Sequence, residues 1–173
     1  MKYIKRHSLT GQILKGLAAA GLLMIAASNP YSILYLIKGF KGRNENEKER
    51  WRKFYRSLNY LDKRGYVKLT EKGDGNLEAR LTRLGRTSVE RINFDELELP
   101  KPGKWDGKWR LVIFDIPNRQ HKNRLAFAHK LKELGFIMVQ KSVWAYPFEC
   151  HKEVAFVRRF YEVDECATYL EAL

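Results

Sequence analysis

The sequence has few of the residues that build metal centres or disulfide frameworks. Its 173 residues include only two cysteines, Cys150 and Cys166, which are far apart and form no Cys-x-x-Cys pair. The four histidines are also scattered: His7, His121, His129 and His151. A structural zinc site usually takes its ligands from closely spaced pairs of Cys and His. The sequence therefore predicts neither a zinc site nor a disulfide scaffold, and it is typical of a protein in the reducing cytoplasm.

Acidic residues are also scarce relative to basic ones. The chain has 33 Lys and Arg against 20 Asp and Glu, a net charge of +13. Residues 1–103 carry 21 basic and 11 acidic side chains, whereas residues 104–173 carry 12 and 9. Such an excess is typical of proteins that bind nucleic acid, and an anionic membrane is the alternative partner. We therefore expect the polyanionic partner to bind the N-terminal half.

One stretch without charged residues leaves a membrane interpretation open. It runs from Gly16 to Ile37 and follows several basic residues, as a signal peptide or membrane anchor would. Asn29 and Pro30 interrupt it, and the remaining apolar run is closer in length to a buried core helix. A soluble cytoplasmic protein is therefore the expectation, and membrane attachment through residues 16–37 is the alternative.

The first elements of the chain are expected to be two apolar helices. Ser8 or Thr10 can cap a helix that continues through Ile25 and ends near Pro30. A second, shorter helix is expected over residues 31–40, where two glycines follow the apolar run.

The helix expected over residues 47–64 has two distinct faces. Bulky apolar residues recur at intervals of three and four and form one stripe: Trp51, Phe54, Tyr55, Leu58 and Leu61. Basic and amide residues recur on another face. A helix that reads the major groove of DNA needs such a face, because Lys and Arg bind phosphates and Arg and Asn bind base edges. A solvated charged surface is the alternative interpretation.

A hairpin is expected directly after this helix. Residues 66–70 and 77–82 form two strands around a glycine-rich turn at residues 73–76. Helices followed by a hairpin are typical of a winged helix-turn-helix, whose hairpin contacts the neighbouring DNA backbone or minor groove. We therefore predict a winged helix-turn-helix over residues 1–91 and a linker with two prolines and a glycine over residues 92–104.

The candidate DNA-binding residues follow from these two elements. Base contacts are expected from Arg52, Arg56 and Asn59. Phosphate contacts are expected from Lys48, Lys53, Lys63, Lys72 and Arg80.

Residues 105–173 have the element order of a ferredoxin-like domain. We expect a strand, a helix, two strands, a helix and a last strand at residues 109–115, 118–134, 136–140, 142–146, 151–161 and 167–170. This β-α-β-β-α-β order predicts an α+β protein with a C-terminal ferredoxin-like domain.

Motifs in this half resemble a known family. They are Trp105-Asp106-Gly107-Lys108-Trp109-Arg110-Leu111-Val112-Ile113-Phe114-Asp115-Ile116-Pro117, Leu134-Gly135-Phe136 and Gln140-Lys141-Ser142-Val143-Trp144. They resemble the central region of PaaX, the phenylacetate-degradation repressor family, and are similar to CRISPR-associated protein two, an adaptation endonuclease. The resemblance implies a repressor that binds double-stranded DNA, with a winged helix before a ferredoxin-like domain. We expect it to act as a homodimer without a cofactor.

The nuclease resemblance leaves an enzymatic alternative open. Asp115 matches the metal-binding aspartate of the nuclease family, which faces its twin across a dimer axis. Carboxylates from two subunits could hold Mg²⁺, which would activate a water for phosphodiester cleavage. Two carboxylates without a neighbouring base form a poor hydrolytic site. A Mg²⁺-dependent endonuclease is therefore the alternative, and a structural role for Asp115, such as capping the next helix, competes with it.

Overall fold

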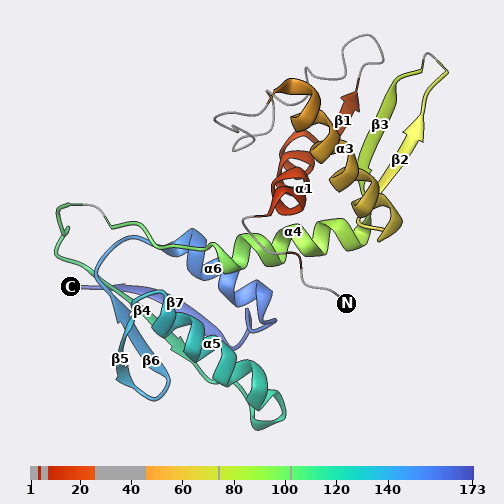
Figure 1. Ribbon diagram of the computed structural model, residues 1–173. Coiled ribbons are helices and arrows are strands. Elements are labelled where there is room, and N and C mark those ends of the chain that lie inside the picture. The colour runs from red at the N-terminus through yellow and green to blue at the C-terminus, as the bar shows by residue number, and fades with distance from the viewer. Residues whose placement is uncertain (1–3, 5–7, 26–45, 74, 102) are drawn as a thin grey trace. The chain divides into compact units, whose positions relative to one another are not determined.

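The protein consists of two compact units, Met1–Glu96 and Leu97–Leu173 (Figure 1). The computed structural model describes residues 4, 8–25, 46–73, 75–101 and 103–173. Each unit combines helices with its own antiparallel sheet, three-stranded in the first and four-stranded in the second. The predicted α+β class is therefore confirmed.

The N-terminal unit begins with α1 (Leu9–Ala20), which Ser8 caps as predicted. The helix is shorter than expected, because Gly21 adopts a positive φ of 77° that ends it. The next residues form strand β1 (Leu22–Ile25), in which alternate side chains are buried against the core. The prediction of one helix through Ile25 is therefore wrong.

The predicted basic helix and hairpin are confirmed. They are α3 (Glu47–Lys63), β2 (Val67–Glu71) and β3 (Leu77–Leu81). Strand β3 lies between β1 and β2 and pairs antiparallel with both. The sheet therefore joins the hairpin to the first part of the chain.

A further helix, α4 (Arg83–Asp95), follows the hairpin directly. The Thr82 side chain caps it by accepting a hydrogen bond from the Gly85 N–H at 3.1 Å. The helix continues past residue 92, where we expected the linker to begin. Ile92 itself is buried in the core of the unit. Residues 92–95 are therefore helical.

The core of the N-terminal unit is built from α1, α3, α4 and the sheet. Apolar side chains from these elements are fully buried together: Ile13, Leu14, Leu17, Phe54, Leu58, Leu61 and Ala79. Burial of this stripe fixes which side of α3 faces the interior. Its opposite side is available to solvent.

The C-terminal unit has the predicted order of elements. They are β4 (Trp109–Phe114), a short 3₁₀ helix η2 (Asn118–Gln120), α5 (His121–Glu133), β5 (Ile137–Gln140), β6 (Val143–Tyr146), α6 (His151–Phe160) and β7 (Ala167–Ala172). The sheet order is β5-β6-β4-β7, with all neighbours antiparallel. This topology is consistent with the predicted ferredoxin-like domain.

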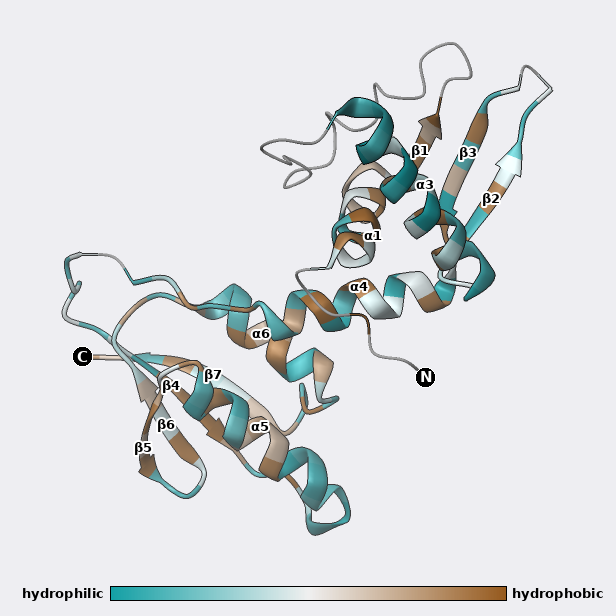
Figure 2. Ribbon diagram, viewed as in Figure 1, coloured by the Kyte–Doolittle hydropathy of each residue, from teal (hydrophilic) through white to brown (hydrophobic). Residues whose placement is uncertain are grey.

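The two faces of this sheet differ. On the helix-covered face, Phe114 of β4 contacts Phe127 of α5 with ring centroids 5.2 Å apart. The other face carries apolar side chains, several of them exposed: Trp109, Leu111, Ile113, Ile137, Val139, Leu170 and Ala172. Figure 2 shows the apolar character of the strands, including β5. We call this set of residues the open sheet face.

The stretch that suggested a membrane segment is only partly described. Residues 16–25 form the end of α1, Gly21 and β1. None of the helices in the described part of the chain is long and apolar enough to cross a bilayer. The rest of the stretch, residues 26–37, lies outside the described residues, and so does the short helix expected over residues 31–40.

Candidate nucleic-acid interface

Helix α3 presents the candidate DNA-binding side chains on one side. Asn46 caps the helix by accepting the Glu49 N–H at 2.9 Å. Phe54, Leu58 and Leu61 are fully buried and hold the opposite side against the core. Because successive residues of a helix turn by about 100°, positions at intervals of three and four lie on one side.

A shallow groove of about 840 Å³ runs along the outer side of α3. Five of the eight predicted DNA-binding residues line it: Lys48, Arg52, Arg56, Asn59 and Lys63. Figure 2 shows the strongly hydrophilic character of this helix. The structure therefore brings the predicted base-contacting residues together with two of the predicted phosphate-contacting lysines. We call these five residues the basic side of α3.

The charges on the basic side of α3 are uncompensated within the described residues. None of its lysines and arginines forms an ion pair with another described residue. Lys53 differs, since its Nζ lies 3.8 Å from the Glu49 carboxylate and its side chain does not line the groove. The positive charge is thus concentrated on the groove, and Lys53 lies outside it.

The two predicted residues of the hairpin share one carboxylate. Lys72 Nζ lies 3.3 Å from Glu78, and the Arg80 guanidinium also donates to Glu78. The hydrogen bond from Arg80 lowers the pKa of Glu78 against the opposing effect of burial, and Lys72 lowers it further. Glu78 therefore offsets part of the positive charge of the hairpin, and these two cations are separate from the basic side of α3.

Hydrogen bonds connect α3 to the hairpin. Asp62 in the last turn of α3 accepts the Leu69 N–H of β2 at 2.9 Å. Gly65 makes the turn between them with a φ of 74°, and its carbonyl accepts from the Thr82 hydroxyl at 2.6 Å. The helix and hairpin are therefore held in a fixed relative orientation.

Two tyrosines on the outer surface of α3 were not predicted as site residues. Sequence spacing placed Tyr55 on the buried stripe, but its side chain is 41% exposed and lines the groove. Tyr60 also lines the groove and is 38% exposed. Tyr55 lies three residues after Arg52 and four before Asn59, and this spacing places it on their side of the helix.

Asp115 directly follows the last residue of β4. Its side chain is exposed, and its backbone N–H donates to the Cys166 carbonyl at 2.8 Å. The helices that follow are preceded by Pro117 and Gln120, so Asp115 does not cap them. Within the described residues, no three His, Cys, Asp or Glu side chains gather in a group that could hold a metal ion.

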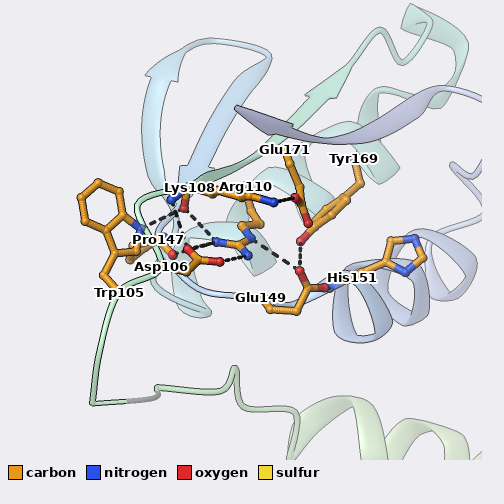
Figure 3. A network of polar contacts seen from close by, with 9 residues as sticks. All are labelled: Trp105, Asp106, Lys108, Arg110, Pro147, Glu149, His151, Tyr169 and Glu171. Carbon is orange, nitrogen blue, oxygen red and sulfur yellow. Dashed lines mark hydrogen bonds and ion pairs between the residues drawn. The ribbon is translucent and has the colours of Figure 1, made fainter. Parts of the chain in front are cut away.

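A buried arginine organises a cluster of polar side chains in the C-terminal unit (Figure 3). The Arg110 side chain, on β4, is only 4% exposed. Its two terminal nitrogens donate to the Asp106 carboxylate at 2.7 and 2.5 Å, and one also donates to the Lys108 carbonyl at 2.8 Å. The hydrogen bonds from Arg110 hold the pKa of Asp106 far below its usual range.

The same cluster reaches α6 and β7. Glu149 lies 3.5 Å from Arg110 Nε and accepts the His151 N–H at 3.0 Å. The Tyr169 hydroxyl of β7 lies 3.4 Å from Glu149, with which it forms a hydrogen bond. Figure 3 shows these side chains converging from different elements. The cluster therefore fastens residues 105–108 to the sheet and helps to fix the start of α6.

The motif that begins at Trp105 thus has a structural role. Trp105 donates to the Lys108 carbonyl at 2.9 Å, and Gly107 takes a φ of 82° in the turn. This turn places Asp106 beside Arg110, where two parallel hydrogen bonds can form. The first residues of the longest motif that suggested a family relationship, Trp105 to Arg110, are therefore those that build and hold this turn.

Comparison with known proteins agrees with the resemblance of these motifs to the central region of PaaX. Residues 102–173 match the family described as the PaaX protein central Cas2-like domain. No curated protein matches the chain. The matched residues include the turn, the Arg110 cluster and the whole four-stranded sheet. The C-terminal unit therefore contains a Cas2-like domain of the type found in the centre of PaaX proteins.

Proposed function

We propose that this protein is a PaaX-like transcriptional regulator whose N-terminal unit is a winged helix that binds double-stranded DNA. The observation that carries the proposal is the basic side of α3, whose lysines and arginines have no ion-pair partner among the described residues. The strand order β1-β3-β2, with a hairpin directly after α3, supports the winged-helix assignment. The PaaX-type domain that follows supports a regulatory role.

In the proposed complex, α3 lies in the major groove. The groove is wide enough to admit a helix, and α3 with its 17 residues is about 25 Å long. Arg52, Arg56 and Asn59 occupy the middle of the helix and would meet base edges. Lys48 and Lys63 lie near its two ends, where they would bind phosphates on either side of the groove.

The hairpin would contact the flanking DNA backbone. Lys72 and Arg80 are partly exposed, at 44% and 60% of their side chains, despite their pairing with Glu78. The shared carboxylate reduces the net charge of the hairpin, so its contribution to affinity should be smaller than that of the basic side of α3. The hairpin would therefore mainly orient α3.

We propose that the C-terminal unit forms a homodimer through the open sheet face. This face contains no charged residue, and Ile137 and Val139 at its edge are 59% and 60% exposed. A second copy would cover these apolar side chains. The resulting two-fold symmetry would select paired half-sites in DNA, and occupancy of such a site would repress transcription.

DNA binding is tested by fluorescence anisotropy on a random duplex pool at about 50 and 200 mM salt. The wild type should bind with strong salt dependence. Arg52→Ala/Arg56→Ala should weaken binding at least about tenfold, because binding to a random pool depends on the cations near the phosphates and this variant removes two of them from the groove. The matched control is Arg83→Ala/Arg86→Ala on the exposed surface of α4, which removes the same charge and should bind more tightly than the first variant.

Two outcomes would contradict this proposal. The first is a wild type that binds no duplex at low salt. The second is equal weakening by both double variants, which would mean that total charge matters and the position on α3 does not. Adding Mg²⁺ to the same samples tests the endonuclease alternative, which no observation on the described residues favours. Cleavage that requires Mg²⁺ and is lost in Asp115→Ala would revive it.

The dimer is tested by light scattering coupled to size-exclusion chromatography. The wild type should elute at about twice the 20.4 kDa mass of the chain. Ile137→Lys should produce monomers, because it places a charge in the apolar interface. Met138→Lys is the matched control, since Met138 is similarly exposed but points to the other face of β5. A monomeric wild type, or equal effects of both variants, would refute this interface.

A further inference from the structure

Tyr55 is an exposed aromatic ring among the polar groups of the α3 groove. Its side chain is 41% exposed and lines the groove together with Arg52 and Asn59. Single exposed apolar residues are common on protein surfaces and need no special explanation. The position of Tyr55 is different because it lies among the three side chains proposed to contact base edges.

Ring contacts hold Tyr55 in place. Its ring stacks on Trp51, with centroids 5.7 Å apart and planes 29° apart. Trp51 in turn contacts Phe54, with centroids 5.5 Å apart, and Phe54 is fully buried in the core. The three rings therefore connect the core to the groove surface. A ring held in this way loses little conformational freedom when it binds a partner.

We propose that the Tyr55 ring contacts the 5-methyl group of a thymine in the major groove and thereby selects thymine at one position of each half-site. This inference rests on the proposed DNA-binding function of α3. The methyl group is the apolar feature that thymine presents in the major groove, and it is recognised by apolar contact. Arg52, Arg56 and Asn59 supply hydrogen-bonding groups, so Tyr55 adds apolar readout to the same surface.

Tyr60 provides a matched comparison on the same helix. It is 38% exposed and also lines the groove, so it is nearly equivalent to Tyr55 in accessibility. The Arg64 guanidinium lies 5.5 Å from its ring centroid. The two tyrosines are five positions apart, which places them about 140° apart around the helix axis. Tyr60 should therefore not reach the thymine that Tyr55 contacts.

The test replaces thymine by deoxyuridine, which lacks only the methyl group. A binding site is first selected from random duplex DNA with the wild-type protein. Each thymine of that site is then replaced singly, and the dissociation constant is measured by anisotropy. We expect one symmetric pair of positions at which loss of the methyl weakens binding about fourfold, the effect of burying one methyl group.

Variants assign the effect to the ring. Tyr55→Ala should bind the thymine and deoxyuridine duplexes equally. Tyr55→Phe and Tyr60→Ala should retain the wild-type preference, because the first keeps the apolar ring and the second lies elsewhere on α3. The wild-type measurement needs no variant, so it tests the inference even if Tyr55→Ala does not fold.

The outcomes separate this inference from the function on which it rests. A wild type that binds duplex DNA but shows no methyl preference at any thymine overturns the Tyr55 inference alone. A preference that persists in folded Tyr55→Ala also overturns it. A wild type that binds no duplex overturns the proposed function and this inference together.

Discussion

Gly85→Ala should destabilise the N-terminal unit, although alanine is the better helix former. A Cβ atom at Gly85 would lie 2.0 Å from the Tyr66 carbonyl oxygen and 2.9 Å from Leu81 Cδ2, where ordinary contacts are 3.4–4 Å. The Tyr66 carbonyl also accepts two hydrogen bonds from Thr82, from its N–H and its hydroxyl, each 3.1 Å long. Relieving the clash must therefore displace either α4 or a hydrogen-bonded carbonyl.

The size of the effect follows from these terms. Overpacking costs about 1–3 kcal/mol, and each weakened hydrogen bond costs about 1 kcal/mol more. Better helix propensity returns at most about 1 kcal/mol. We therefore expect a net loss of about 2–3 kcal/mol in the free energy of unfolding, measured by urea denaturation followed by circular dichroism.

The matched control is Thr87→Ala in the same helix. Thr87 is exposed, and its hydroxyl donates to the Arg83 carbonyl within the helix. The control should change the free energy of unfolding by no more than about 0.5 kcal/mol. A Gly85→Ala protein as stable as the wild type would show that the close approach of α4 to Tyr66 is not a constraint on the fold.

Three further predictions concern charge and ionisation. Lys63→Ala should lower the slope of log Kd against log salt by about 1 per protomer, whereas Lys53→Ala should leave it unchanged, and equal slopes for both variants would contradict the groove assignment. The depressed pKa of Asp106 stabilises the fold fully above about pH 4, and this stabilisation is lost as the pH falls. Asp106→Asn should therefore flatten the acid side of the stability profile, and an unchanged profile would refute this. Burial raises the pKa of Cys150 to about 12, so iodoacetamide at about pH 8 should label Cys166 first, and faster labelling of Cys150, read by peptide mass spectrometry, would contradict its burial.

Local sequence signals were sufficient for α3 and for the order of elements in the C-terminal unit. The 3.6-residue period of α3 identified Phe54 and Leu58 as buried and Arg52 as outward-facing, and the structure agrees. The strand signals failed at Leu22–Ile25, because a short apolar run fits a buried helix as well as a strand. Its partner is β3, more than fifty residues later, and pairing at that distance leaves no local signal.

The charge pattern of the site was less predictable than its helix. Sequence spacing cannot show that Glu78 holds both Lys72 and Arg80, since that pairing depends on the geometry of the hairpin. It also placed Tyr55 on the buried stripe, because an aromatic residue beside buried positions is usually counted as core. Only the packed structure shows that the Trp51 ring lies between Tyr55 and the interior.

The separation of the two sides of α3 has a consequence for how such proteins diversify. Residues that anchor the helix are fully buried, whereas none of the five residues of the basic side belongs to the core cluster of the described residues. Substitutions at exposed positions usually change stability by less than about 0.5 kcal/mol. In the proposed function, evolution or a designer could therefore change the preferred DNA sequence by altering this surface alone, while the folding of the unit is preserved.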